Sequence, residues 1–439
     1  MASLPGHERG LGLGLNTRND ADTFFPSQIA THRPGAHFEI LSNPEFLAAG
    51  TAVQDLLHPD RVIIGSARTP QGRRAAESLA RIYAAWVAPS RILTINLFSS
   101  ELAKLVANSM LAQRLSSINS ISAICEATGA EITEVATSIG RDSRIGEKFL
   151  RAGIGFGGSC FKKDVLSLVY LAESLGLQEV GAYWRQVVIM NEYQRDRFTA
   201  RVIKLLNNTL VSKKITILGY AFKKNTSDTR DSPALEIVKT LLEEGPREIA
   251  IFDPCCNPLV IKAEIRALSG WGKALSEDGG PVKVYTNAYD AAAASNAVLV
   301  VTEFDEFRNT KPAASSKPAA PVAAPQPTPT TETKKPAPSS PEFPEENFHP
   351  EPACAADCPD CEIEKTTSVP VAVMKVYKPQ EQLDWPRIAA GMRAPKWLFD
   401  GRCIIEPRAM SRLGIRVESI GSAGFSTAGW GDDEEEGEC

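Results

Sequence analysis

Apolar residues recur at helical spacing in several stretches of this chain and form short continuous runs in others. Leu102, Leu105 and Val106 follow one stripe of the stretch 99–129, which predicts a helix capped by Ser99 or Ser100. Further helices are expected over 75–86, 131–139, 165–175 and 182–207. The central third of the chain is therefore predicted to be mainly helical.

Short apolar runs, each closed by glycine, proline or a charged residue, predict strands. They lie at 38–41, 61–65, 214–218, 249–252, 297–302, 397–402 and 416–420. Between the third and fourth of them, Ser232-Pro233 is a good helix start and Gly245 a good helix end. Strands that alternate with helices imply parallel sheets, so the fold class is α/β.

The composition changes sharply between residues 309 and 377, which are rich in proline, alanine, serine and threonine. Such a stretch cannot build a core, and we expect a disordered insertion within the second α/β region. Cys354, Cys358 and Cys361 lie inside it, with His349 nearby. Their spacing fits no strong zinc pattern, so chance is the better explanation and no metal is expected.

Charge and cysteine content exclude several classes of protein. The chain has 439 residues, 48 Lys and Arg against 53 Asp and Glu, and an odd number of cysteines, nine. No basic stripe indicates nucleic acid, and no apolar run approaches the length of a membrane span. The first residues lack an apolar signal segment, so we expect a flexible leader over 1–36, an acidic tail over 425–439 and a cytoplasmic protein without a membrane partner.

The stretch with the clearest chemistry is Gly153 to Asp164, GIGFGGSCFKKD. Glycines make the backbone permissive and let amide groups approach a ligand closely. Cys160 is followed by two lysines, and cationic neighbours favour the thiolate form of a cysteine. A buried, inert cysteine is the commoner case in general. The flanking charges favour a nucleophile beside a ligand-binding loop instead.

Other candidate side chains are less specific when taken alone. Glu45 follows Pro44 in a strand-end turn, where a carboxylate is well placed for proton transfer, although a lone glutamate is usually solvated. Lys104 and Asn108 are four residues apart and so share one helix face. The loop 219–232 carries Lys223 and Arg230, and cations at the carboxyl edge of a sheet suit phosphate binding. Ordinary surface residues would explain each of these equally well.

Three stretches carry a resemblance to a known family. GFGGSCFKKD (155–164) resembles the catalytic loop of the UDP-glucose 6-dehydrogenases, in the UDP-glucose/GDP-mannose dehydrogenase family. SNPEFLAAGTA (42–52) and SSELAKLVANSMLAQR (99–114) are similar to the same family, and the likeness extends over 38–308 and 382–421. It implies the remnant of an N-terminal Rossmann-like NAD-binding domain at 37–95 and a central helical dimerisation domain at 96–207. A Rossmann-like UDP-binding domain at 208–308 and 378–424 would follow, interrupted by the insertion.

The resemblance also implies roles for individual residues. Catalysis would fall to Cys160 as nucleophile, Lys104 as oxyanion stabiliser, Glu45 and Asp164 in proton transfer and water orientation, and Asn108 in holding the sugar. The implied substrate contacts are Glu45, Phe46, Leu47, Lys104, Asn108, Arg144 (reaching a neighbouring subunit's ligand), Phe149, Leu150, Arg151, Gly153, Gly155, Phe156, Gly157, Phe222, Lys223 and Arg402. The implied NAD contacts are Cys160, Lys163 and Arg230.

Family members begin with a strand that leads into a glycine-rich, NAD-binding turn. Here the resemblance starts at Phe38, and Ala49 stands where the family often has an acidic residue near the cofactor. The first half of the NAD-binding domain is therefore expected to be absent. The sequence leaves three hypotheses: an NAD-dependent homo-oligomeric dehydrogenase acting on UDP-glucose through a cysteine thiohemiacetal and thioester, a UDP-sugar-binding protein without that activity, and, more weakly, a scaffold acting through the insertion.

Overall fold

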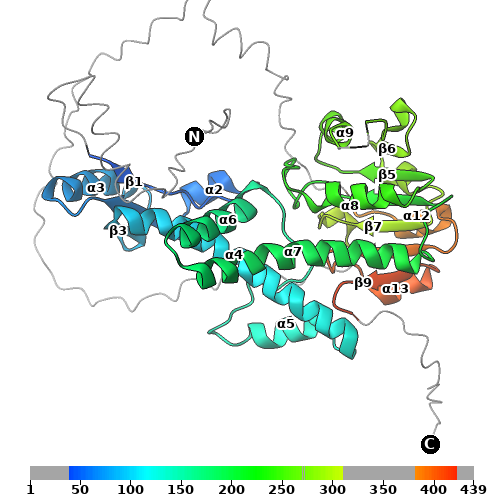
Figure 1. The fold of residues 1–439 in the computed structure, drawn as a ribbon, viewed down its shortest axis with the longest axis horizontal. Helices are drawn as coiled ribbons and strands as arrows, with labels where there is room; N and C mark the ends of the chain where they lie inside the picture. Colours follow the sequence, from blue (N-terminus) through cyan, green and yellow to red (C-terminus); the bar gives the residue numbers. More distant parts are fainter. Residues whose placement is uncertain (1–38, 269, 271, 310–380, 423–439) are drawn as a thin grey trace, which may run out of the picture. The chain divides into compact units, whose positions relative to one another are not determined.

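The computed structural model describes residues 39–268, 270, 272–309 and 381–422, which form two sheets connected by a group of helices (Figure 1). The elements around the first sheet are β1 (Leu41–Ser42), α2 (Ala52–Leu57), β2 (Val62–Ser66), α3 (Pro70–Tyr83), the 3-10 turn η1 (Pro89–Arg91) and β3 (Ile92–Asn96). The sheet order is β1-β2-β3, with β1 antiparallel to β2 and β2 parallel to β3.

Strand β2 is the centre of this first sheet, and all five of its residues are buried. Val62 and Ile64 pack with Ala76 of α3 and with Val87. Helix α3 begins five residues before the predicted start, because Thr69 caps it by accepting a hydrogen bond from the Gly72 N–H at 2.9 Å. The Thr-Pro sequence at 69–70 was the signal that the prediction overlooked.

The central helices are α4 (Leu97–Thr128), α5 (Ile132–Gly140), α6 (Ser159–Ser174) and α7 (Gln178–Leu205). Helices α4, α6 and α7 pack together through a core that includes Ala112, Val165 and Val187 (Figure 1). The predicted cap of α4 at Ser99 or Ser100 was wrong. Asn96 is the cap, and its Oδ1 accepts a hydrogen bond from the Ser99 N–H at 2.9 Å.

The start of α6 differs from the prediction in a way that matters for the site. We expected a helix over 165–175, whereas α6 begins at Ser159, immediately after Gly158. Its first turn is polar and follows a glycine run, so apolar periodicity could not detect it. Cys160 therefore lies in the first turn of a helix rather than in a loop.

The second sheet has six parallel strands in the order β6-β5-β4-β7-β8-β9. Its elements are β4 (Lys214–Leu218), α8 (Pro233–Glu243), β5 (Glu248–Phe252), α9 (Pro258–Arg266), η2 (Ser276–Asp278), β6 (Val282–Tyr285), α10 (Ala288–Ala292), β7 (Ala297–Val300), η3 (Asp305–Phe307), α12 (Trp385–Gly391), β8 (Trp397–Asp400), α13 (Pro407–Arg412) and β9 (Arg416–Ser419). The central strands β4 and β7 are buried throughout, as expected for a parallel sheet with both faces covered.

This strand order is the doubly wound Rossmann order, with its switch point between β4 and β7. Strands β7 and β8 pair directly although residues 301–396 separate them in the sequence. The predicted insertion thus lies within one domain, while its own residues, like the predicted leader and acidic tail, fall outside the described ranges. Among the residues that the structure describes, no helix is both long and apolar enough to cross a membrane.

Candidate active site

Cys160 is exposed in the first turn of α6. A helix N-terminus carries unpaired amide groups and a partial positive charge, and both stabilise a nearby anion such as a thiolate. Lys162 pairs with Glu192 at 2.9 Å, whereas the neighbouring Lys163 is exposed. The cysteine that the sequence singled out is thus accessible and lies in an electrostatic environment that suits a nucleophile.

Two pairs of predicted residues face each other across α4 and α6. Lys104 and Asn108 are one turn apart on α4, and Cys160 and Asp164 are one turn apart on α6. The Asn108 side-chain amide donates to Asp164 Oδ2 at 2.6 Å. Asp164 is only 4% exposed, so this bond fixes a buried carboxylate on the helix face that carries Cys160.

Glu45 joins this group through Lys104. The Lys104 ammonium donates to Glu45 Oε1 at 2.7 Å and to the Glu45 carbonyl, and the Leu47 N–H donates to Oε2 at 2.8 Å. Partial burial opposes ionisation of Glu45, but these hydrogen bonds and the charges of Lys104 and Lys163 outweigh it and hold the pKa of Glu45 below its ordinary value. Phe46 lies beside the pair, with Lys104 Nζ 5.6 Å from its ring centroid.

Arg402, which follows β8, reaches the loop that precedes Cys160. Its guanidinium donates to the carbonyls of Gly155 at 3.0 Å, Val301 at 2.6 Å and Phe222 at 3.5 Å. Asp400 supports this turn, because its carboxylate accepts backbone hydrogen bonds from Arg402 and from the two isoleucines that follow. The structure therefore brings three predicted substrate residues, Gly155, Phe222 and Arg402, into contact.

Glycines in the loop allow it to pack closely against α7 and against the turn before α8. Gly155 has a φ of +106°, and a Cβ there would lie 2.6 Å from Asn191 Oδ1. A Cβ on Gly157 would lie 2.5 Å from the Asp231 carbonyl oxygen. The Gly158 N–H donates to the Arg230 carbonyl at 3.0 Å. At these positions glycine serves close packing within the protein, not only approach to a ligand as the sequence suggested.

The remaining predicted residues are spread more widely. Arg144 pairs with Asp142 at 2.6 Å, and its side chain is 87% exposed. Phe149 and Arg151 are exposed and Leu150 is buried. Lys223 Nζ lies 5.6 Å from the centroid of the Phe222 ring, and Arg230 pairs with Asp228 at 2.8 Å.

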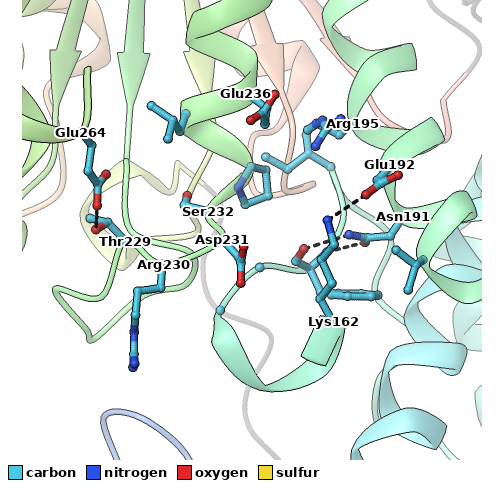
Figure 2. Close-up of a pocket in the computed structure, with 17 residues that line it drawn as sticks. Lys162, Asn191, Glu192, Arg195, Thr229, Arg230, Asp231, Ser232, Glu236 and Glu264 are labelled. Atoms are coloured by element: carbon cyan, nitrogen blue, oxygen red, sulfur yellow. Dashed lines mark hydrogen bonds and ion pairs between the residues drawn. The ribbon is translucent and has the colours of Figure 1, made fainter. Parts of the chain in front are cut away.

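A cavity of about 490 Å³ lies beside the glycine loop (Figure 2). Its lining includes Phe156, Gly157 and Arg230, which were predicted as ligand contacts, and Lys162, Asn191, Glu192, Arg195, Asp231, Ser232, Glu236 and Glu264, which were not. Several of these come from the polar run MNEYQRDR of α7. Their sequence pattern resembles an ordinary solvated helix face, so it gave no sign of a site.

A second cavity, of about 310 Å³, lies behind the strand-end turn after β1. Glu45, Phe46 and Leu47 line it together with Arg61, whose guanidinium carbon is 4.0 Å from the Phe46 ring centroid. No group of three or more His, Cys, Asp or Glu residues that could hold a metal occurs in the described ranges. The cysteines at 354, 358 and 361 lie outside those ranges.

The first sheet offers little for a dinucleotide among its described residues. Strands β2 and β3 and helix α3 form one βαβ unit, but the turn SARTPQG (66–72) between β2 and α3 has one glycine, and a Cβ on it would lie 2.5 Å from the Ala67 carbonyl oxygen. This turn does not fit a pyrophosphate, which needs a glycine-rich turn entering a helix. The NAD contacts at Cys160, Lys163 and Arg230 remain predictions.

Taken together, the described residues form a Rossmann-ordered sheet, a smaller α/β sheet and a group of helices that carries the exposed Cys160. The sequence agrees with three profiles of one family: its NAD binding domain over 17–87, its central domain over 98–193 and its UDP binding domain over 216–324. The chain belongs to the UDP-glucose/GDP-mannose dehydrogenase family. The NAD binding match begins at residue 17, so the expectations that this domain is largely missing and that the resemblance starts at Phe38 were wrong.

Individual relatives agree with this family. UDP-glucose 6-dehydrogenase of Drosophila melanogaster is 52% identical over 282 residues, 63% of this chain and 58% of that protein. UDP-glucose 6-dehydrogenase 5 of Oryza sativa subsp. japonica is 39% identical over 402 residues, 90% of this chain and 68% of that protein. A UDP-glucose dehydrogenase structure from Pyrobaculum islandicum is similar with a TM-score of 0.56 and 31% identity, over 65% of this chain and 60% of that one. The chain thus spans about three fifths of the first of these relatives.

Proposed function

We propose that this protein oxidises the C6 alcohol of UDP-glucose to the carboxylate of UDP-glucuronate in an NAD-dependent, four-electron reaction. The observation that carries the proposal is the convergence of Cys160, Asp164, Asn108, Lys104 and Glu45 on facing helices and the adjoining turn. It combines a nucleophile, two carboxylates, an ammonium group and an amide, which are the groups that this oxidation requires. The names of the relatives support the choice of substrate.

The proposed residue roles follow from the positions of these groups. Glu45, held ionised, accepts the proton of the C6 hydroxyl as hydride leaves the carbon and the aldehyde forms. Cys160 Sγ then bonds to the aldehyde carbon, and Lys104 stabilises the oxyanion of the thiohemiacetal. Loss of a second hydride leaves a thioester, which water oriented by Asp164 hydrolyses, breaking the C–S bond and releasing the acid. NAD, when bound, would accept one hydride, so the two oxidation steps together would consume two NAD molecules in succession.

The substrate's nucleotide is proposed to lie at the carboxyl edge of the second sheet. Phe222, Lys223 and Arg402 follow β4 and β8, beside the switch point of the strand order. Arg402 already bridges this edge to the cysteine loop through Gly155. A sugar diphosphate held at this edge would place its sugar toward α6 and Cys160.

A homo-oligomer through the central helices is part of the proposal. Met110, Ile124, Tyr170, Tyr183 and Ile189 of α4, α6 and α7 are between 46% and 56% exposed in the isolated chain. Apolar groups gathered on neighbouring helices are typical of a protein interface. We expect sedimentation equilibrium to show a dimer or larger assembly, and a monomer at micromolar concentration would contradict this.

Removal of the Cys160 thiol tests the function directly. Purified protein given UDP-glucose and NAD should form NADH steadily, and Cys160→Ser should lower this rate by on the order of a thousandfold or more, as loss of other covalent nucleophiles does. Cys255→Ser is the matched control, because burial raises the pKa of that thiol to about 12 and keeps it protonated. UDP-glucose binding without any NADH would instead support a sugar-nucleotide-binding protein.

A further inference from the structure

The loop that precedes Cys160, residues 152–158, is held by side-chain amides from two helices. Gly153 donates its N–H to Asn119 Oδ1 of α4 at 2.9 Å and accepts at its carbonyl from Gln194 Nε2 of α7 at 2.9 Å. Phe156 donates its N–H to Asn191 Oδ1 at 2.8 Å and accepts at its carbonyl from Asn191 Nδ2 at 3.0 Å. Both backbone groups of these two loop residues are therefore satisfied by amide side chains.

These bonds supply the partners that the buried backbone groups of the loop need. Residues 152–156 are buried but form neither helix nor strand, so their backbone groups would lose water without gaining the partners that regular structure provides. An amide side chain offers one donor and one acceptor side by side, which matches the two groups of a single residue. Asn191 makes both bonds to Phe156, whereas Gly153 needs two different helices.

Asn191 holds the loop closer to Cys160 than the other two amides do. Its contact at Phe156 is four residues before Cys160 and next to Gly155, whose carbonyl accepts from Arg402. A Cβ on Gly155 would lie 2.6 Å from Asn191 Oδ1, so the loop is packed tightly against this amide. In Figure 2 the side chain of Asn191 points from α7 toward the loop, with Lys162 and Glu192 beside it.

Gln194, one of the two amides that hold Gly153, is itself held by neighbouring side chains. Gln194 is 1% exposed, its Nε2 also donates to Ser122, and its Oε1 accepts from Arg197 at 2.9 Å. Arg197 pairs with Glu126 of α4. The face of α7 with Asn191, Gln194 and Arg197 thus forms a rigid support under the loop.

We propose that Asn191 is a positioning residue, which fixes the loop through Phe156 and thereby sets the placement of Cys160 at the start of α6. Its side-chain amide bonds to the backbone of Phe156 and not to Cys160 or Asp164, so it acts through the loop and not in the chemistry. The consequence for turnover rests on the function proposed above, while the consequence for the loop does not.

Two variants separate the hydrogen bonds from side-chain volume. Asn191→Ala removes both bonds, and Asn191→Asp keeps the volume but places a carboxylate oxygen opposite the Phe156 carbonyl. Gln178→Ala, at the exposed start of the same helix, is the matched control. We expect hydrogen exchange in 153–158 to become at least about tenfold faster in both Asn191 variants, with β4 and α8 unchanged. The rate of Cys160 alkylation, followed on its peptide by mass spectrometry, should change at least threefold.

Turnover provides a further readout that a purely structural role would not move. If the wild-type protein turns over, kcat should fall tenfold or more in both variants with KM changed less than threefold. If it does not, exchange and alkylation still decide the proposal independently of the function. Uniformly faster exchange across the whole protein, or unchanged exchange and alkylation in Asn191→Asp, would overturn the positioning role.

Discussion

At the scale of single residues, the site depends on which charged groups lie next to each other. Glu45 is 61% exposed at its side chain, yet its pKa lies below the ordinary value because Lys104 and the Leu47 N–H stabilise the carboxylate against partial burial. A carboxyl group with a lowered pKa stabilises the folded state above the pKa of the unfolded chain. That contribution is lost as the pH falls through the lower, folded-state pKa.

Replacing Lys104 should reverse this shift. In Lys104→Ala the partial burial of Glu45 stays while the ammonium is gone, so the pKa of Glu45 should rise. The variant should be less stable than the wild type at pH 7, and this difference in stability should shrink toward acid pH. The titration of the Glu45 carboxyl carbon by NMR, assigned with Glu45→Gln, measures the change. Lys239→Ala removes a weak ion pair on α8, 3.9 Å long, and should leave the Glu45 titration unchanged. A Glu45 titration that is identical in the wild type and Lys104→Ala would contradict this account.

Residue identities were partly predictable because they are tied to a motif. The sequence and its family resemblance singled out Asn108, Asp164, Lys104 and Glu45, and the structure brings them together in two hydrogen-bonded pairs. Asn191 was not predictable, because an asparagine on a polar helix face has the same pattern whether it contacts solvent or a loop from a distant part of the sequence. Such contacts depend on tertiary packing, which periodicity does not record.

At the scale of elements, buried strands were the most predictable. Strands β4 and β7 match the predicted runs closely, because a strand covered on both faces is mostly apolar, and in β4 the two polar residues, Lys214 and Thr216, are themselves buried. The strands β3 and β6 were missed; β3 has no buried residue and β6 has only one, so neither forms a clear apolar run. The start of α6 was missed because its first turn follows a glycine run and has no apolar periodicity of its own, although Phe161 packs against the helical core.

The glycine loop shows how elements constrain each other. Gly157→Ala would place a Cβ 2.5 Å from the Asp231 carbonyl oxygen and 2.9 Å from Phe222 Cβ, so either the loop or the turn before α8 must move. We expect a loss of about 1–3 kcal/mol in the free energy of unfolding, measured by urea denaturation, as for other overpacked sites. The rate of NADH formation should fall with it, because the loop leads directly into the first turn of α6, where Cys160 lies.

Gly391→Ala provides the matched control for this substitution. The nearest atom to a Cβ there is 3.9 Å away, at the end of α12. Alanine is the better helix former, so the control should be neutral or stabilising by up to about 1 kcal/mol. Equal stability of the Gly157 and Gly391 variants would show that the loop has more room than the structure gives it.

At the scale of the whole molecule, the second sheet closes across a long sequence separation. Strands β7 and β8 pair in register from Ala297 and Trp397 onward. The segments that flank the insertion are also hydrogen-bonded to each other. The Leu383 N–H donates to the Glu306 carbonyl at 2.8 Å, and the Trp385 indole donates to the Phe307 carbonyl at 3.2 Å. The sheet therefore needs the insertion's two ends in place, whatever lies between them.

Excision of the insertion tests this reasoning. Replacing residues 311–378 with a short Gly-Ser linker keeps both hydrogen bonds and the β7–β8 pairing. Because loop closure costs only about 0.6 kcal/mol per doubling of length, the free energy of unfolding should change by no more than about 2 kcal/mol. UDP-glucose affinity by calorimetry and the rate of NADH formation should stay within threefold of the wild type. Deleting Leu383 to Gly391 instead removes α12, whose buried Trp385 and Ile388 belong to the core, and should prevent folding. If the excised protein folded but lost sugar-nucleotide binding, the insertion would have a role in the site that the sheet's architecture does not explain.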